Sequence, residues 1–252
     1  MKWILLALVV LFLVCAFLFG LLTYITRSLP SNDLPVPERT KIEFPYQQSE
    51  KIAYEATFKG LKVGTFEFEY KGRNNDLDLI VVTNKVNIFN IFQIDSTESV
   101  YIDAYTCLPK RVERKVVFFG SPEKIIEEYN QKEGWVNVTQ EKGGKTKNTV
   151  IPQKPPIHNV HSLFFAYPLE LKDKVGLELD FNLPLEKVKM RVKEVRKEET
   201  EQGPKEFYVC EISPKRIVLE LDKDKRYPLY IEMPALCGKL EISKLDEQSL
   251  CK

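Results

Sequence analysis

The sequence has few histidines and almost no net charge, and both shortages limit what the protein can do. Its 252 residues include two histidines, and 37 basic against 36 acidic side chains leave a formal net charge of +1. Without a basic excess there is no long-range field to attract nucleic acid, so we expect no nucleic-acid partner. His158 and His161 lack an Asp, Glu or Cys at helical spacing, whereas zinc needs three or four protein ligands. We therefore predict no metal site and no cofactor.

Motifs for catalysis are also missing. Ser162 follows His161 directly, but nothing places an orienting acid beside them to complete a nucleophilic triad. The sequence shows neither a glycine-rich phosphate loop nor a carboxylate pair in a recognisable frame. A hydrolase acting on an envelope polymer would need a polar cleft with perturbed carboxylates, which the sequence does not indicate. We therefore expect that the protein is not an enzyme.

One long apolar run stands at the N-terminus. Residues 3–25, WILLALVVLFLVCAFLFGLLTYI, contain no charge and no proline. A bilayer core needs roughly 20 apolar helical residues, whereas a cleaved signal peptide has an apolar region of roughly 7–15 followed by small residues. Cys15 does not indicate a lipoprotein, because Leu13 and Val14 precede it where small residues are expected. Residues 1–27 are therefore predicted to form a retained transmembrane signal anchor.

The flanks of this run indicate where the rest of the chain lies. Lys2 and Arg27 place one charge on each side, so the positive-inside rule discriminates weakly. The remaining domain resembles an exported one, which favours a single-pass protein of the bacterial inner membrane with its C-terminal domain in the periplasm. Residues 28–48 carry four prolines in a polar context and are predicted to form an extended tether. Residues 49–252 are assigned to the periplasmic β-domain.

This domain is predicted to be all-β, because apolar and polar residues alternate along most of it. Gly60 and Gly64 are expected to bracket the first turn, and a short helix is expected from residue 158 to Pro168. The pattern favours a mainly antiparallel curved sheet or open half-barrel around this helix. Strands are expected at 52–58, 65–70, 77–86, 96–103, 110–119, 124–130, 134–140, 145–151, 176–183, 186–199, 206–212, 216–221, 229–233 and 238–245.

The order of these features resembles a bacterial envelope family known as domain of unknown function 3108 (DUF3108). The residues that carry the resemblance are Tyr54, the run 60–64, the run 101–109, Pro155-Pro156 followed by 162–165, and the segments 227–232 and 238–240. The family is similar in shape to envelope lipoprotein carriers, which are half-barrels around an apolar cavity. The resemblance therefore implies binding of a lipid or acyl chain, and the retained anchor departs from the cleaved signal typical of such carriers.

Aromatic clusters supply candidate ligand-binding residues. Residues 87–94 depart from strict alternation, and we interpret them as a strand bend at the mouth of a cavity. Two aromatic runs, 118–119 and 164–167, are candidates to line the same space. The alternative is that these side chains form ordinary core. The candidates are Phe89, Ile91, Phe92, Phe118, Phe164, Phe165 and Tyr167.

Four cysteines follow the apolar run: Cys107, Cys210, Cys237 and Cys251. In an oxidising compartment they allow two disulfides in three connectivities, and a bridge between the last two would pin the C-terminal tail. The alternative is that they are buried or unpaired thiols.

Two functions remain open. The first is a membrane-anchored, non-enzymatic periplasmic domain that binds a lipid-like or apolar ligand in a half-barrel. The second is a structural adaptor that docks another envelope protein through its surface or a sheet edge.

Overall fold

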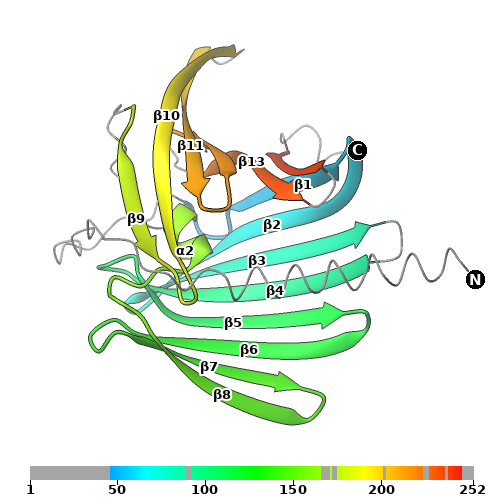
Figure 1. Ribbon diagram of the computed structural model, residues 1–252, viewed down its shortest axis with the longest axis vertical. Helices are drawn as coiled ribbons and strands as arrows, with labels where there is room; N and C mark the ends of the chain where they lie inside the picture. Colours follow the sequence, from blue (N-terminus) through cyan, green and yellow to red (C-terminus); the bar gives the residue numbers. More distant parts are fainter. Residues whose placement is uncertain are drawn as a thin grey trace, which may run out of the picture.

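The computed structural model describes residues 46–88, 92–165, 171, 175–200, 203–223, 227–235 and 238–245. These residues form one antiparallel sheet and one short helix (Figure 1). The first part of the sheet is a meander of eight strands: β1 (Lys51–Phe58), β2 (Leu61–Asn74), β3 (Leu77–Ile88), β4 (Phe92–Asp103), β5 (Pro109–Phe118), β6 (Ser121–Asn130), β7 (Trp135–Lys142) and β8 (Lys145–Pro152).

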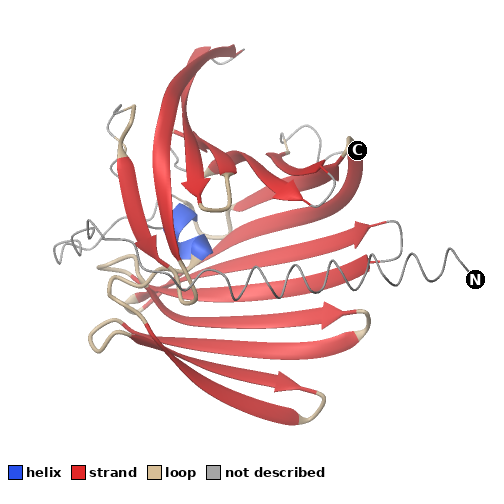
Figure 2. Cartoon of the chain, viewed as in Figure 1, coloured by secondary structure: helices blue, strands red, loops and turns tan. Residues whose placement is uncertain are grey.

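Helix α2 (Val160–Phe165) follows β8, and a second meander completes the sheet. Its strands are β9 (Glu178–Asn182), β10 (Lys187–Thr200), β11 (Gly203–Ser213), β12 (Ile217–Asp222), β13 (Pro228–Ala235) and β14 (Gly238–Lys244). The prediction of an all-β, mainly antiparallel open sheet with a short helix is confirmed, and Figure 2 shows strands dominating the described chain. The expected helix was longer, but 166–170 lie outside the described residues.

The sheet is curved, and the segment that follows one edge strand reaches the other edge strand. Its strand order runs from β8 through β1 and β14 to β9, so β8 and β9 are the edges. The segment after β8 reaches β9, where the His158 N–H donates to the Asn182 carbonyl at 2.7 Å. Gln153 Nε2 donates to the Leu183 carbonyl at 2.7 Å beside it. These bonds close the end of the sheet at which α2 lies, as in a half-barrel (Figure 1).

The hydrophobic core lies between the curved sheet and α2. Both meanders contribute large, fully buried side chains, and Leu163 of α2 is 2% exposed among them. Burying each such side chain contributes about 1.5–3 kcal/mol, so the core strongly favours the curved form. The fully buried strand residues include Phe68, Ile80, Ile102, Phe181, Met190, Leu219 and Leu221.

Helix α2 begins where it does because Asn159 caps it. The Asn159 Oδ1 accepts the His161 N–H at 2.8 Å, and the Asn159 N–H donates to Ser162 Oγ at 3.1 Å. This reciprocal pattern resembles a capping box and satisfies backbone donors that have no partner inside the helix. The local sequence therefore fixes the start of the helix.

Gly64 does not bracket a turn, so that prediction was wrong. The first turn consists of Lys59 and Gly60, both with positive φ (52° and 75°), and β2 already begins at Leu61. Gly64 lies inside β2, paired with Ala56 on one side and Val86 on the other. A Cβ atom there would lie 2.7 Å from the Lys85 carbonyl oxygen. Glycine is needed at this position for close strand approach rather than for a turn.

The membrane prediction falls on other residues. Across the described ranges no helix has both the length and the apolar character to cross a bilayer. The expected anchor, 1–27, and residues 28–45 of the expected tether lie outside those ranges. The tether was predicted to extend to residue 48, but Tyr46 is 6% exposed and packs in the hydrophobic core, so the domain begins before residue 49.

We predict that Gly64→Ala destabilises the protein, because the new methyl group meets a backbone oxygen that cannot move cheaply. Overpacking of this kind lowers the free energy of unfolding by about 1–3 kcal/mol. Gly238→Ala is the matched control: this glycine also lies in a strand without positive φ, and its nearest neighbour is the flexible end of Lys59 at 3.4 Å. Urea unfolding of the full chain followed by Trp fluorescence measures both. Equal stability of the two variants would contradict the prediction.

Candidate functional site

Strand register identifies the inner face of the curved sheet. Residues directly opposite each other in paired strands project to the same face. Phe68 lies opposite Val82, Val82 opposite Glu98, and Glu98 opposite Arg114. Phe68 and Val82 belong to the core that α2 covers, so this set of residues faces inward.

A buried ionic network lies on the inner face beside α2. Glu98 of β4 is 4% exposed, and its carboxylate accepts hydrogen bonds from Arg114 Nε at 2.5 Å and Asn159 Nδ2 at 3.2 Å. The Nε2 atom of His161 lies 3.7 Å from the same carboxylate. Glu127 extends the network, with one oxygen 3.8 Å from Arg114 Nη1. These contacts tie β4, β5 and β6 to the first turn of the helix.

The charges of this network are set by burial and by mutual contact. Burial favours protonation of Glu98, but the charges of His161 and Arg114 and the hydrogen bonds from Arg114 and Asn159 outweigh it, so the Glu98 pKa lies below its ordinary value. Burial lowers the pKa of His161, although the Glu98 carboxylate opposes this shift. The network therefore holds a carboxylate against an arginine and anchors the helix.

Farther from α2 the inner face is apolar and only half-buried. Gly64 lies opposite Val86, Val86 opposite Ile94, and Ile94 opposite Phe118, so one row crosses four strands. We call the half-buried apolar residues of this region the inner apolar strip. It consists of Phe58, Phe66, Val86, Ile94, Val116 and Phe118 on β1 to β5.

The structure places two of the predicted ligand-binding side chains. Phe118 belongs to the inner apolar strip, and its ring meets Phe119 edge-on with centroids 4.5 Å apart. Phe164 lies on α2, half-buried against the core. Phe118 ends β5 at the end of the sheet opposite α2, so these two do not form one cluster (Figure 1). Phe89, Ile91, Tyr167 and the side chains of Phe92 and Phe165 lie outside the described part.

Sequence reasoning missed most of the inner apolar strip and the ionic network. The alternation of residues 96–102 carries the missed signal, because Glu98 shares its face with Val100 and Ile102, both 0% exposed. A charge in phase with buried residues marks an inward-facing position. The interpretation of 87–94 as a bend also needs correction, because Ile88 of β3 pairs with Phe92 of β4 and the segment joins two strands.

Two polar atoms among the inner-face side chains are buried without a hydrogen-bond partner in the described part of the chain: the Tyr54 hydroxyl and Asn84 Oδ1. Phe66 of the strip lies opposite both residues. The Asn84 amide donates to Ser96 Oγ at 3.1 Å, which leaves its oxygen available. An unsatisfied buried polar atom costs about 1–3 kcal/mol, so these atoms mark places where a polar group of a ligand or a water fits.

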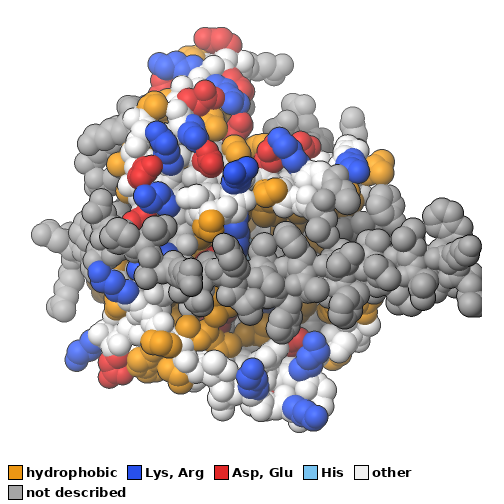
Figure 3. Space-filling model, viewed as in Figure 1, with side chains coloured by type: hydrophobic (Ala, Val, Ile, Leu, Met, Phe, Trp, Pro, Cys, Tyr) orange, Lys and Arg blue, Asp and Glu red, His pale blue; other side chains and the backbone are white. Residues whose placement is uncertain are grey.

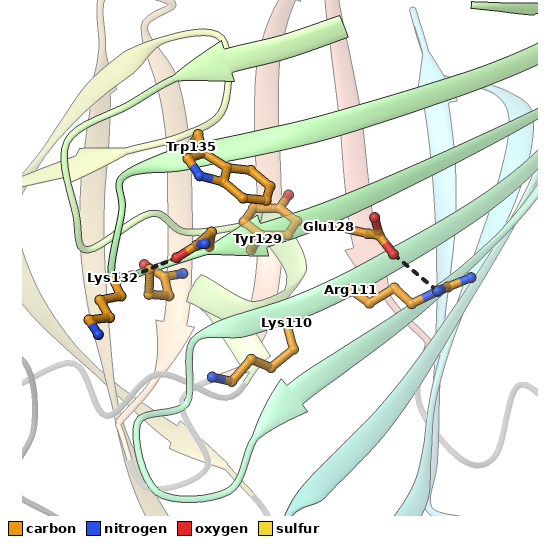
Figure 4. Close-up of a pocket in the computed structure, with 8 residues that line it drawn as sticks. Lys110, Arg111, Glu128, Tyr129, Lys132 and Trp135 are labelled. Carbon is orange, nitrogen blue, oxygen red and sulfur yellow. Dashed lines mark hydrogen bonds and ion pairs between the residues drawn. The ribbon is translucent and has the colours of Figure 1, made fainter. Parts of the chain in front are cut away.

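A pocket of about 570 Å³ opens near the turn between β6 and β7 (Figure 4). Register places its Arg111 and Glu128 opposite each other on the outer face, and they form an ion pair at 3.4 Å. Lys110 lies 3.4 Å from Asp103, and Trp135 Nε1 donates to Glu133 at 2.8 Å. Because these polar groups already contact each other, we favour the inner face as the binding surface.

Two of the candidate disulfide cysteines are free thiols in the structure. Cys107 and Cys210 are both buried, and burial raises the pKa of each thiol to about 12. Cys210 packs on β11 opposite Val192 and Leu219 and behaves as a small apolar residue. For these two residues the structure therefore shows the alternative, buried thiols, whereas Cys237 and Cys251 lie outside the described residues.

His158 gives the fold a pH dependence. It is 0% exposed, packs edge-on against Phe181, and burial lowers its pKa from 6.5 to about 4. The folded state resists protonation of His158, whereas the unfolded state does not. The free energy of unfolding that depends on a neutral His158 is therefore fully present above pH 6.5 and is lost as the pH falls toward 4. We predict a loss of up to roughly 3 kcal/mol over this range, measured by urea unfolding.

His158→Gln should flatten this part of the pH profile, because glutamine does not titrate. The reference is His158→Gln combined with His161→Gln, which removes both histidines of the chain. If the profile of His158→Gln matches that of the wild type, burial of this imidazole is not the cause.

Comparisons with known proteins identify the family. Among solved structures, the chain is similar to the β-barrel-like protein of domain of unknown function DUF1849 from Brucella abortus, with 10% identity and a TM-score of 0.49 over 78% of this chain and 95% of that chain. A comparison with curated proteins gave no match. The model of the DUF3108 family, described as a protein of unknown function, matches residues 53–243, which confirms the resemblance. The chain therefore belongs to the DUF3108 family.

Proposed function

We propose that this protein binds a lipid-like or other apolar ligand on the inner face of its half-barrel and catalyses no reaction. The observation that carries the proposal is the inner apolar strip, which continues past the region that α2 covers. Val86, Ile94, Val116 and Phe118 are half-buried and lie beyond the residues packed into the core. Soluble domains rarely leave a contiguous apolar surface inside a concavity unless something binds there.

The shape of the strip suits an extended hydrocarbon chain. Its central row crosses β2 to β5, and strands are spaced by about 4.8 Å, so an acyl chain laid across them contacts each strand in turn. Each methylene group removed from water contributes about 0.8 kcal/mol. The unsatisfied Tyr54 hydroxyl and Asn84 oxygen beside the strip supply hydrogen bonds for a polar part of the ligand.

The location of the protein belongs to the same proposal. Residues 1–27 anchor the chain in the bacterial inner membrane, and the tether at 28–48 keeps the β-domain on the periplasmic side. A fixed anchor keeps the inner face close to one membrane, which is a source of acyl chains. The protein then binds a ligand at that membrane and does not shuttle between membranes.

We predict that Val116→Glu prevents binding, because it places an unpaired carboxylate in the strip. Burying such a charge costs several kcal/mol, so the affinity should fall more than about tenfold. Val117→Glu is the matched control: Val117 is the next residue of β5 and points to the outer face, where it is 40% exposed. The full chain is labelled with a photoreactive fatty acid, and labelled peptides are mapped by mass spectrometry.

In the wild type and in Val117→Glu, labels should map to β2–β5. Circular dichroism checks that both variants fold. Labels found in residues 1–27 alone, or equal labelling of both variants in the sheet, would falsify the proposal.

A second function, docking of another envelope protein, is favoured by the free edge of β8. Every residue of β8 except Ile151 is exposed, and Val150 is 62% exposed. Such an edge can accept an added strand. Its lysines at 145 and 147 act against uncontrolled pairing.

Asn148→Pro tests this second function. Lys142 and Lys145 flank the two-residue turn between β7 and β8, so the N–H groups of residues 146, 148 and 150 point away from β7. Proline at 148 therefore removes a donor from the free edge and keeps the β7 pairing. Crosslinking of the full chain in membranes should lose a partner band in this variant if the edge docks a protein. A band that persists unchanged would rule out docking through this edge.

A further inference from the structure

The hairpin of β7 and β8 places three lysines on the inner face. Glu123 of β6 lies opposite Lys142 of β7, and Lys142 lies opposite Lys145 of β8. Lys147 projects to the same side, because residues two apart in a strand share a face. These three lysines, which we call the lysine rim, therefore border the concave side of the sheet.

The lysine rim carries an excess of positive charge. Lys142 has a partner, since its Nζ lies 3.0 Å from Glu123. Lys145 and Lys147 are exposed, and within the described ranges neither has a carboxylate at ion-pair distance. Three lysines facing one glutamate leave a local charge of +2. By contrast, Lys51 on the outer face pairs with Glu67 at 2.8 Å.

The lysine rim lies close to the inner apolar strip on the same face. Val116 of the strip lies opposite Glu123, Glu123 opposite Lys142, and Lys142 opposite Lys145, so the rim begins two strands away from the strip. Figure 3 shows the same juxtaposition, with basic side chains gathered at the lower edge, where Figure 1 places β7 and β8, beside hydrophobic side chains. The surface therefore has an apolar part and a cationic part side by side.

We infer that the ligand is an anionic phospholipid, whose acyl chains lie on the inner apolar strip and whose phosphate contacts Lys145 and Lys147. The inference rests on the proposed function and names the class of its ligand. Charge complementarity carries it, because an ammonium group binds phosphate as a point charge, and a lipid whose own cation offsets its phosphate brings no net negative charge to balance the lysines. The predicted anchor supplies the source, since a membrane holds such lipids within reach of the domain.

The test compares two photoreactive lipids with identical diazirine-bearing chains, one phosphatidylglycerol and one phosphatidylcholine. The full chain in a neutral detergent is titrated with each, and labelling of the β2–β5 peptides is quantified. We expect phosphatidylglycerol to reach half-saturation at a concentration about tenfold lower, since each lysine near an anionic lipid contributes several-fold in affinity. High salt should reduce this difference.

The lysine rim is tested by Lys145→Glu together with Lys147→Glu, which should abolish the preference for phosphatidylglycerol. Lys85→Glu together with Lys115→Glu is the matched control, because it makes the same change in net charge at exposed positions of the outer face. This control should retain the preference for phosphatidylglycerol. Circular dichroism checks the folding of each variant. Lys145→Gln together with Lys147→Gln is a milder version of the same test, because it removes the two positive charges without reversing them.

The outcomes separate the two proposals. If both lipids label the strip equally in the wild type, the head-group inference fails and the proposed function stands. If neither lipid labels β2–β5, the proposed function fails, and the inference fails with it. A loss of preference in both charge-reversed pairs would assign the effect to net charge and overturn the role of the lysine rim.

Discussion

The pairing of β1 with β14 is the interaction on which the rest of the structure depends. It joins residues far apart in the chain, such as Tyr54 and Lys244, whereas the other strand pairs in the described sheet connect neighbours in sequence. Without it, β1–β8 and β9–β14 would be two separate meanders, each with an uncovered apolar face. Closing so long a loop costs entropy before any contact repays it, so the common core must supply the compensating free energy.

A second connection determines the shape of the inner face. The bonds between the segment after β8 and the end of β9 close the sheet on the side of α2, and the helix fills that end. The buried carboxylate of Glu98 needs its partners in good geometry, because a buried charge is strongly unfavourable without them. Arg114 and Asn159 provide them, which fixes the helix on β4 and leaves the far end of the inner face uncovered by α2.

The inner face therefore has two parts, one that stabilises the fold and one that is proposed to bind the ligand. Near α2 it is core, and stability depends on packing and on the ionic network. Farther along β2 to β5 it is a half-buried apolar surface, bordered by the lysine rim on β7 and β8. A fold by itself does not specify a function, so the proposal of lipid binding rests on this combination of surface chemistry rather than on the family.

The sequence by itself determined the local elements. Alternation located the strands, the prolines located the short helix, and the order of motifs identified the DUF3108 family. These features depend on backbone geometry and on residues close in the chain, so a local pattern is sufficient. The transmembrane anchor at 1–27 stays a prediction of the same local kind.

Only the tertiary structure decided which residues meet across the sheet. The sequence did not single out Glu98 or Arg114, and Gly64 was predicted to border a turn; the register of the strands showed what each of them contacts. The inner apolar strip and the lysine rim likewise consist of single residues taken from successive strands. Pairing between distant strands is set by the summed free energy of burying one whole face, and no short stretch of sequence contains that sum.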